Sequence, residues 1–277
     1  MKHQFNPFII EYETITSPIL DFKSECILAA QIISSKNMNK LPIAVMMSGG
    51  IDSQLAAEAF LNAGIPFVCV ICKLQTVLAT ETIIFNEHDY QYAERWCRTN
   101  NVDIVYCYLD IFKQAELLTK YALSGIGFSP QYASHMFIMK WCQDNGFFYV
   151  AGMGEIDIVL KDGVYYATDD QREFSLDNFC KIHCIEGEFL FWKQDARLTA
   201  ATLQLPTVKR LIKAGMPKLL KYKHDYFSDT FEFEPRPKYT GFENIQEWDS
   251  ILRNYMKRFI SGYDDVYYTP ISTFEQR

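Results

Sequence analysis

A short segment rich in serine and glycine carries the residue types that hold phosphate groups. Residues 48–53 have the order Ser-Gly-Gly-Ile-Asp-Ser and lie between an apolar run, residues 43–47, and a helical pattern that stops at Gly64. Where a strand meets a helix through such a turn, backbone N–H groups and the positive end of the helix dipole point at one spot, which suits a phosphate or pyrophosphate. Glycines let a ligand approach the backbone closely, and Asp52 can hold the Mg²⁺ that accompanies phosphates.

Residues 48–53 differ from the Walker-type phosphate loop, because no lysine follows the glycines. They resemble the S-G-G-x-D-S signature of the PP-loop ATP pyrophosphatases, a superfamily that includes asparagine synthetases, GMP and NAD synthetases and several tRNA-modifying enzymes. The resemblance covers residues 41–157 and is specific at residues 48–53. The alternative interpretation is a plain tight turn that binds no ligand.

The resemblance implies an ATP pyrophosphatase with ATP and Mg²⁺ as cofactors. In such an enzyme a substrate oxygen attacks the α-phosphorus of ATP, pyrophosphate leaves, and a nitrogen or sulfur nucleophile then displaces AMP. Asp52 is expected to be catalytic and to hold Mg²⁺, and the adenine is expected near residues 45–47 and 71–73. The residues expected to contact the nucleotide here are Met46, Met47, Ser48, Gly49, Gly50, Ile51, Asp52 and Ser53.

A second glycine-rich segment, residues 152–157, follows the apolar run at residues 147–151. It brings two glycines and two carboxylates to the side of the sheet where residues 48–53 are expected, and we predict that it forms a second wall of the nucleotide site. The alternative is a turn into a hairpin. The expected residues are Gly152 and Gly154 at the nucleotide, Glu155 and Asp157 as catalytic carboxylates, and Asp157 as a second Mg²⁺ ligand.

Residues 152–157 also resemble the G-x-G-x-D-E element of asparagine synthetases, with a departure. An ungapped match puts Ile156 where that family has Asp, and Asp157 where it has Glu. Two further side chains are candidates for the same site. Lys73 directly follows a predicted strand and is expected to approach the adenosine or the phosphates, or else to be an exposed strand-end lysine. His135 lies on a predicted helix, where it is expected to be structural or to meet the nucleotide or substrate.

The eight cysteines indicate a reducing cytoplasm rather than a disulfide scaffold. Cys69 and Cys72 are three apart within a predicted strand, so they point to opposite faces and are expected to be core residues. The segment with Cys180, His183 and Cys184 offers three zinc ligands in five residues, whereas a closed structural zinc site needs four. We therefore favour ordinary roles for these three.

The elements that must position these residues alternate between strands and helices. This pattern predicts an α/β fold: a doubly wound parallel sheet, Rossmann-like and of the HUP-type α/β/α sandwich that the resemblance implies, with a smaller mixed C-terminal extension. Ligands in such sheets bind beyond the carboxyl ends of the strands. The predicted strands are residues 43–47, 66–72, 102–109 and 147–151, and the predicted helices are residues 21–35, 86–99, 114–123 and 131–144.

The alternation changes after residue 155. A hairpin around Asp162-Gly163, a further strand at residues 188–192 and helices near 195–204, 206–214 and 244–260 are predicted there. We therefore divide the chain into two domains. Residues 1–157 are expected to form the ATP pyrophosphatase core, and residues 158–277 a hairpin and helical region that covers the substrate.

Bulk composition narrows the class of protein. The 277 residues are 49% hydrophobic, carry a formal net charge of −7 and contain no run long enough to span a membrane. The negative net charge disfavours tight non-specific binding to nucleic acid. Lys209 to Lys223 nevertheless holds six basic residues and no acidic one. A solvated helix face is the preferred interpretation of this basic run, and a phosphate-facing or nucleic-acid-facing patch is the alternative.

Within the ATP pyrophosphatases we favour C–N ligation in the style of asparagine synthetases, with a small-molecule substrate and an amine donor. Met1 is followed by Lys2 rather than by the cysteine that glutaminase domains expose, so ammonia is expected to be free or to come from a separate glutaminase. The alternative is modification of a nucleic-acid base or nucleotide by thiolation, amidation or nitrile formation. A third hypothesis is a nucleotide-binding protein without turnover. The oligomeric state is left open.

Overall fold

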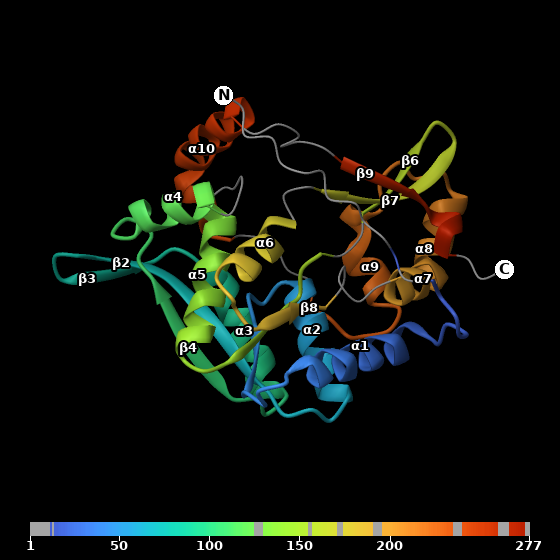
Figure 1. Ribbon diagram of the computed structural model, residues 1–277, viewed down its shortest axis with the longest axis horizontal. Coiled ribbons are helices and arrows are strands. Elements are labelled where there is room, and N and C mark those ends of the chain that lie inside the picture. The colour runs from blue at the N-terminus through green and yellow to red at the C-terminus, as the bar shows by residue number, and fades with distance from the viewer. Residues whose placement is uncertain are drawn as a thin grey trace.

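The computed structural model describes residues 12, 14–124, 130–154, 157–170, 174–190, 196–234, 240–259 and 266–274 (Figure 1). Its centre is a mostly parallel sheet. The parallel strands are β1 (Ile43–Met46), β2 (Val68–Leu78), β4 (Ile104–Leu109), β5 (Phe148–Ala151) and β8 (Gly187–Phe189), and their pairings give the order β4-β2-β1-β5-β8. The predicted α/β class with a parallel sheet is therefore confirmed.

This strand order places a topological switch point beside β1. The chain moves outward from β1 to β2 and β4, and it then returns to the other side of β1 with β5. The connections that leave the carboxyl ends of the neighbouring strands β1 and β5 therefore both start beside this point. The crevice that opens at such a point is where doubly wound sheets bind ligands. Residues 48–53 follow β1, and residues 152–154 follow β5.

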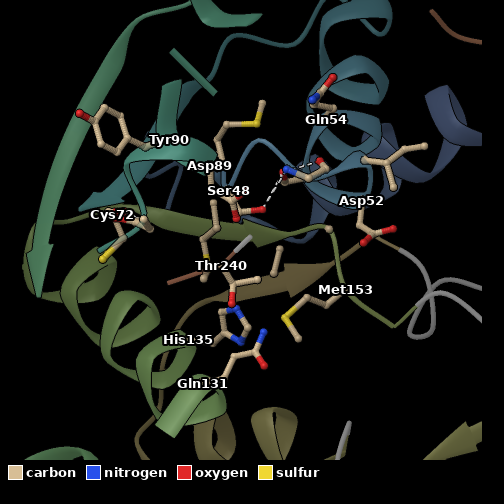
Figure 2. Close-up of a pocket in the computed structure, with 18 of the residues that line it drawn as sticks. Ser48, Asp52, Gln54, Cys72, Asp89, Tyr90, Gln131, His135, Met153 and Thr240 are labelled. Carbon is tan, nitrogen blue, oxygen red and sulfur yellow. Dashed lines mark hydrogen bonds between the residues drawn. The ribbon is translucent and has the colours of Figure 1, made fainter. Parts of the chain in front are cut away.

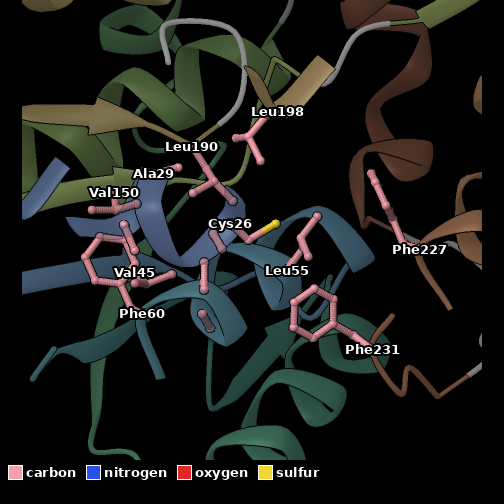
Figure 3. Packing of buried hydrophobic residues seen from close by; sticks show 14 of the residues in the cluster. Cys26, Ala29, Val45, Leu55, Phe60, Val150, Leu190, Leu198, Phe227 and Phe231 are labelled. Atoms are coloured by element: carbon pink, nitrogen blue, oxygen red, sulfur yellow. The ribbon is translucent and has the colours of Figure 1, made fainter. Parts of the chain in front are cut away.

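Helices cover both faces of the sheet. One face carries α1 (Phe22–Lys36), α2 (Ile51–Asn62) and α3 (Glu87–Thr99), and the other carries α4 (Ala115–Ser124), α5 (Pro130–Asp144) and α6 (Phe174–Ile182). Successive side chains of β1 alternate between these two layers: Val45 packs with the first and Ala44 with the second. Figure 3 shows the first layer, where Cys26 and Ala29 of α1 lie near Leu55 of α2.

A separate antiparallel sheet consists of β6 (Asp157–Lys161), β7 (Val164–Asp170) and β9 (Val266–Pro270). The predicted hairpin around Asp162 and Gly163 is confirmed. Both residues have positive φ, 51° and 78°, as a two-residue type I′ turn requires. Figure 1 shows this sheet at one end of the molecule, beside α7 (Ala196–Gln204) and α8 (Pro206–Lys213).

The remaining described elements are short, apart from one helix. They are η2 (Leu220–Tyr222), α9 (Lys223–Phe227), η3 (Phe242–Ile245), α10 (Gln246–Phe259) and η4 (Ile271–Phe274). Phe227 and Phe231, near α9, pack against α1 in the first hydrophobic layer, and the Phe22 and Phe227 rings stack with their centroids 5.4 Å apart. The segment from η2 to Phe233 is thus fixed against the same layer as the helix that follows β1. No helix in the described part of the chain is long and apolar enough to cross a membrane.

Two elements differ from the sequence prediction. The strand predicted at residues 66–72 runs on to Leu78 and turns back as β3 (Glu81–Ile84), because Leu74 and Thr76 continue the alternation of buried side chains beyond Lys73. Helix α6 was not expected. The strand predicted at residues 188–192 forms as β8 and extends the central sheet, although it lies in the region assigned to the second domain. The division at residue 157 stays a prediction.

Phe60 provides a test of the first layer. Its side chain is fully buried in α2, whereas that of its neighbour Leu61 is 37% exposed. We expect Phe60→Ala to lower the free energy of unfolding by about 3–5 kcal/mol, because it leaves a cavity that the layer cannot fill. Leu61→Ala should cost less than about 1 kcal/mol. Urea titration measures both, and equal costs for the two variants would contradict this packing.

Candidate functional site

The turn after β1 has a backbone that only glycine accommodates. Gly49 has φ of +79°, and a Cβ there would lie 2.6 Å from the carbonyl oxygen of Asp89 and 2.8 Å from the amide nitrogen of Ala93. Residues 48–50 therefore pass directly against the first turns of α3. Helix α2 begins immediately afterwards at Ile51, with Gly50 as its N-cap residue.

Hydrogen bonds within the loop fix its shape. Ser48 Oγ accepts from the Gly50 N–H at 3.2 Å, Ser53 Oγ donates to the Gly50 carbonyl at 2.8 Å, and Gln54 Nε2 donates to the Gly49 carbonyl at 2.7 Å. The N–H groups of residues 51–53 have no acceptor among the described residues. They lie at the positive end of a twelve-residue helix, so the loop offers preorganised donors to an anion.

The loop opens into a cavity of about 520 Å³, within the range of small-ligand sites. The described lining residues come from eight parts of the chain that converge at the switch point. Figure 2 shows its labelled side chains, with Gln131 and His135 across the cavity from Ser48. Its lining residues include Met46, Met47, Ser48, Gly50, Ile51, Asp52, Ser53, Cys72, Asn86, Asp89, Tyr90, Gln131, Ser134, His135, Ile138, Gly152, Met153, Gly154, Lys221, Lys223, His224, Phe233, Glu234, Thr240 and Phe242.

The segment after β5 forms the opposing wall at close range. A Cβ at Gly152 would lie 2.1 Å from the carbonyl oxygen of Asp52 and 2.9 Å from the Cα of Ser53. Gly152 thus lets the end of β5 touch the first turn of α2. Gly154 also lines the cavity, with φ of +82°. Glu155, predicted to be catalytic, lies outside the described residues.

Asp52 has two carboxylate oxygens in different surroundings. Oδ2 lies 2.5 Å from the Nζ atom of Lys223, whereas Oδ1 is buried and has no hydrogen-bond partner among the described residues. Asp52 lines the cavity, and a carboxylate with one unpartnered oxygen is the kind of group that holds a divalent cation. The described residues contain no cluster of three or more metal-ligating side chains. Mg²⁺ in ATP-using sites is commonly held by one or two carboxylates together with phosphate oxygens and water, so the single carboxylate of Asp52 fits such an ion.

Asp157 and Lys73 are not among the described residues that line the cavity. Asp157 begins β6, where it forms an ion pair with Lys218 at 2.7 Å and accepts from the Leu220 N–H at 3.3 Å. Its carboxylate therefore joins β6 to the segment before α9, and its predicted role as a second Mg²⁺ ligand stays a prediction.

Lys73 points to the opposite face of β2 from Cys72 and Leu74, as the alternation of a strand requires. Its ammonium lies 3.2 Å from a carboxylate oxygen of Glu94 and over the rings of Tyr90 and Tyr106, 4.1 and 4.4 Å from their centroids. Burial and the hydrogen bond that Tyr106 donates to Glu94 raise the pKa of Tyr106 to about 12. Lys73 therefore supports Tyr90, which lines the cavity, and does not itself reach it.

The start of α3 was not predicted to be part of the site. Asn86 is the N-cap residue of α3, but its side chain makes no cap hydrogen bond. It accepts from the Leu74 N–H at 2.9 Å and donates to the Cys72 carbonyl at 2.8 Å. The Met47 N–H donates to the Val70 carbonyl on the same edge of β2. The Asn86 side chain therefore pairs with the backbone groups of β2 that lie beyond the end of β1. This clamp brings Asp89 and Tyr90 to the cavity, and no sequence motif marked it.

A stripe of α5 supplies another wall. Gln131, Ser134, His135 and Ile138 line the cavity at positions i, i+3, i+4 and i+7 of the helix. The structure therefore places His135 at the cavity, as one of its two predicted roles requires.

The basic run divides between two surroundings. Lys209 and Lys213 on α8 are exposed, as a solvated face predicts. Lys221 and Lys223 line the cavity together with His224. Lys221 and Lys223, which follow α8, thus form a cationic wall of the cavity. This position agrees with the alternative interpretation of the basic run, a phosphate-facing or nucleic-acid-facing patch.

The cysteines have separate surroundings. Cys69 packs in the first hydrophobic layer, while Cys72 packs against the second and lines the cavity, so the predicted opposite orientation is confirmed. Cys180 lies 3.1 Å from the hydroxyl oxygen of Tyr149, and Cys184 is exposed. His183 contacts the ring of Phe179. The described residues therefore give no zinc cluster in this segment.

Cys72 is the thiol at the cavity, and its reactivity is testable. Its contact with Cys107 on β4, together with burial, raises the pKa of the Cys72 thiol. Because the thiolate is the reactive form, we expect N-ethylmaleimide at pH 7 to modify Cys72 at least about tenfold more slowly than the exposed Cys184. Mass spectrometry of timed samples measures both rates. Equal rates would contradict a protonated Cys72 and would favour a sulfur-transferring role for it.

No family model matches the sequence, and no curated protein matches it. Solved structures with partial similarity include a predicted subunit of tRNA methyltransferase from Methanocaldococcus jannaschii, which is 17% identical with a TM-score of 0.33; the match covers 53% of this chain and 66% of that one. An NH3-dependent NAD synthetase from Campylobacter jejuni is 11% identical with a TM-score of 0.33, covering 86% and 94% of the two chains. An NMN synthetase from Francisella tularensis is 14% identical with a TM-score of 0.35, covering 87% and 98%. These values are too low to assign an activity to the chain.

Proposed function

We propose that this chain is an ATP-dependent adenylating enzyme that converts ATP to AMP and pyrophosphate at residues 48–53. The observation that carries the proposal is the set of N–H groups of residues 51–53, which have no acceptor among the described residues and belong to residues that line a cavity of about 520 Å³ at the switch point of the sheet. The buried, unpartnered Oδ1 of Asp52 at the same place supports it. The S-G-G-x-D-S resemblance of these residues agrees with this chemistry.

In the proposed reaction, negative charge develops on the leaving pyrophosphate, next to the N–H donors of the loop. A substrate oxygen forms a bond to the α-phosphorus, the bond from that phosphorus to the bridging oxygen breaks, and the electron pair leaves with the β,γ-pyrophosphate. The N–H groups of residues 51–53 stabilise this developing charge without reorganising, and the hydroxyl of Ser48, which accepts from the Gly50 N–H, adds a further donor. Asp52 would hold Mg²⁺, which supplies further neutralisation of the phosphate oxygens. Met46 and Met47 at the end of β1 provide an apolar wall for the adenine.

The favoured second half of the reaction is C–N ligation in the style of asparagine synthetases, in which an amine displaces AMP from an activated carboxyl or carbonyl carbon. Modification of a nucleic-acid base or nucleotide is the second candidate. It is favoured by one observation: Lys221 and Lys223 of the basic run line the cavity together with the aromatic rings of Tyr90 and Phe242. A cytoplasmic location, a glutaminase partner and the two-domain division stay predictions from the sequence.

Pyrophosphate release from ATP tests the proposal. Purified protein with Mg²⁺ and ATP is screened with pools of carboxylic acids plus ammonium or amino compounds, and separately with RNA, DNA and free nucleotides. Stimulation by an acid together with an amine supports ligation, and stimulation by nucleic acid or nucleotide supports the second candidate. ATP binding without pyrophosphate release in any pool would leave a nucleotide-binding protein without turnover.

A further inference from the structure

The Lys223–Asp52 ion pair connects the cationic wall to the phosphate loop across the cavity. The two atoms lie 2.5 Å apart, and both side chains are about three-quarters buried, with 22% and 23% of their surface exposed. The residues are 171 positions apart in the chain. Lys223 is held in place by its own element, because it begins α9, and the Tyr226 and Phe227 side chains of that helix are buried in the first hydrophobic layer.

This ion pair competes with the role that Asp52 has in the proposed function. An ammonium at hydrogen-bond distance from a carboxylate competes with Mg²⁺ for it, because the two cations repel each other in a partly buried site. The other oxygen of Asp52 is buried without a partner among the described residues. Lys223 therefore satisfies only one of the two carboxylate oxygens, which leaves Asp52 an incompletely satisfied anion in the wall of the cavity.

We propose that Lys223 is a catalytic residue that changes partner during turnover, an inference that rests on the proposed function. In the resting protein Lys223 neutralises Asp52. With Mg²⁺ and ATP bound, Asp52 would hold Mg²⁺ instead, and the ammonium of Lys223 would turn to the β,γ-phosphates that the loop would hold within the same cavity. Lys223 then stabilises the pyrophosphate as it leaves, and it returns to Asp52 when pyrophosphate and Mg²⁺ depart.

The exchange requires no proton transfer. The bond between the α-phosphorus and the bridging oxygen breaks with its electron pair on pyrophosphate, and the ammonium of Lys223 keeps its three protons throughout. A lysine ammonium suits this role because it is a compact charge on a flexible stem and can move between two oxygen acceptors. Lys218, five residues earlier, is bound to Asp157 at 2.7 Å, so the exchange is assigned to Lys223 alone of these two.

Binding of two defined probes tests this assignment without knowledge of the acceptor substrate. Calorimetry measures the affinity of the protein for magnesium pyrophosphate, and a Mg²⁺ titration at fixed ATP gives the Mg²⁺ concentration for half-maximal nucleotide binding. Lys223→Met should weaken pyrophosphate binding roughly 10- to 100-fold, because a charge-assisted contact is lost. The same variant should need roughly fivefold less Mg²⁺, because Asp52 no longer has a competing cation. Opposite changes in the two values are the signature of partner exchange.

Two variants complete the experiment. Lys223→Arg keeps a cation and should retain pyrophosphate binding within about fivefold of the unmodified protein. Lys213→Met removes a charge from the same basic run at an exposed position outside the cavity lining, and it should change neither value. Lys223→Gln replaces Lys223→Met if the latter does not fold.

The outcomes distinguish a failure of the proposed function from a failure of partner exchange by Lys223. If the unmodified protein binds neither ATP nor pyrophosphate, the proposed function is wrong and this inference falls with it. If the unmodified protein binds both and Lys223→Met leaves the two values unchanged, or moves both in the same direction, partner exchange is wrong while the proposed function stands. An equal loss in Lys213→Met would also overturn the assignment, because it would attribute the effect to the overall charge.

Discussion

Asp52→Asn is expected to reduce AMP formation by at least about 100-fold, the largest effect of any single change in the loop. The carboxamide keeps the shape of the side chain but removes the charge that would hold Mg²⁺, and charge stabilisation of this kind accounts for two to three powers of ten in rate. The change also leaves the ammonium of Lys223 without its carboxylate partner at 2.5 Å. Release of pyrophosphate from ATP, with an acceptor found in the screen, measures the effect.

Glu58→Gln is the matched control for this variant. Glu58 lies on the same helix α2, outside the cavity lining, and its carboxylate accepts from the Trp96 Nε1 at 3.1 Å. Burial raises the pKa of Glu58, so an uncharged amide that can still accept this hydrogen bond should be tolerated. The control should keep its rate within about twofold, as surface-like changes away from a site do. Undiminished AMP formation in Asp52→Asn would remove Asp52 from the chemistry.

Gly152→Ala is expected to separate the two walls of the site. The added methyl group would lie 2.1 Å from the carbonyl oxygen of Asp52, so either β5 or the first turn of α2 must move. Overpacking of this kind costs about 1–3 kcal/mol in the free energy of unfolding. Displacement of the loop by even a fraction of an ångström disturbs the donors that face the phosphates, so pyrophosphate release should fall roughly 100-fold. Urea titration and the pyrophosphate assay measure the two effects.

Gly64→Ala distinguishes this steric effect from the general cost of replacing a glycine. Gly64 follows the far end of α2, where nothing lies within 4 Å of an added Cβ, and its φ of +66° makes alanine strained. It should lose about 1 kcal/mol in stability and keep its activity. If Gly152→Ala were no more harmful than Gly64→Ala, the close contact between the end of β5 and α2 would be wrong.

The sequence was sufficient for the features that depend on local pattern. The apolar runs at β1, β4 and β5 predicted buried parallel strands, and the Asp162-Gly163 pair predicted a hairpin because only a type I′ turn needs positive φ at both positions. Residues 48–53 were placed correctly between a strand and a helix, since the change from strand to helix periodicity is local. Gly152 was expected at the site from the position of its strand, and the structure gives the physical reason, its contact with Asp52.

The parts of the site that could not be predicted depend on long-range packing. Lys73 follows an apolar run at a position that looked like the end of a strand, but β2 continues and turns Lys73 toward Glu94. Asp157 was read as one of a pair of site carboxylates, whereas its partner Lys218 is brought to it by the fold. Lys223 could be recognised only as part of a basic run, because its distance from Asp52 is set by the docking of α9 against α1.

The order in which the walls appear during synthesis follows from their places in the chain. Residues 48–53 are made early, whereas the lining residues Lys221, Lys223, Phe233 and Phe242 come after the whole parallel sheet. A growing chain therefore holds an exposed anion-binding loop, with Asp52 unneutralised, before its cationic partner exists. Domains fold progressively as they emerge, so the last segment to dock both covers the cavity and cancels the charge at its base. The docking of this segment therefore covers the cavity and at the same time adds Phe227, Phe231 and Phe233 to the first layer.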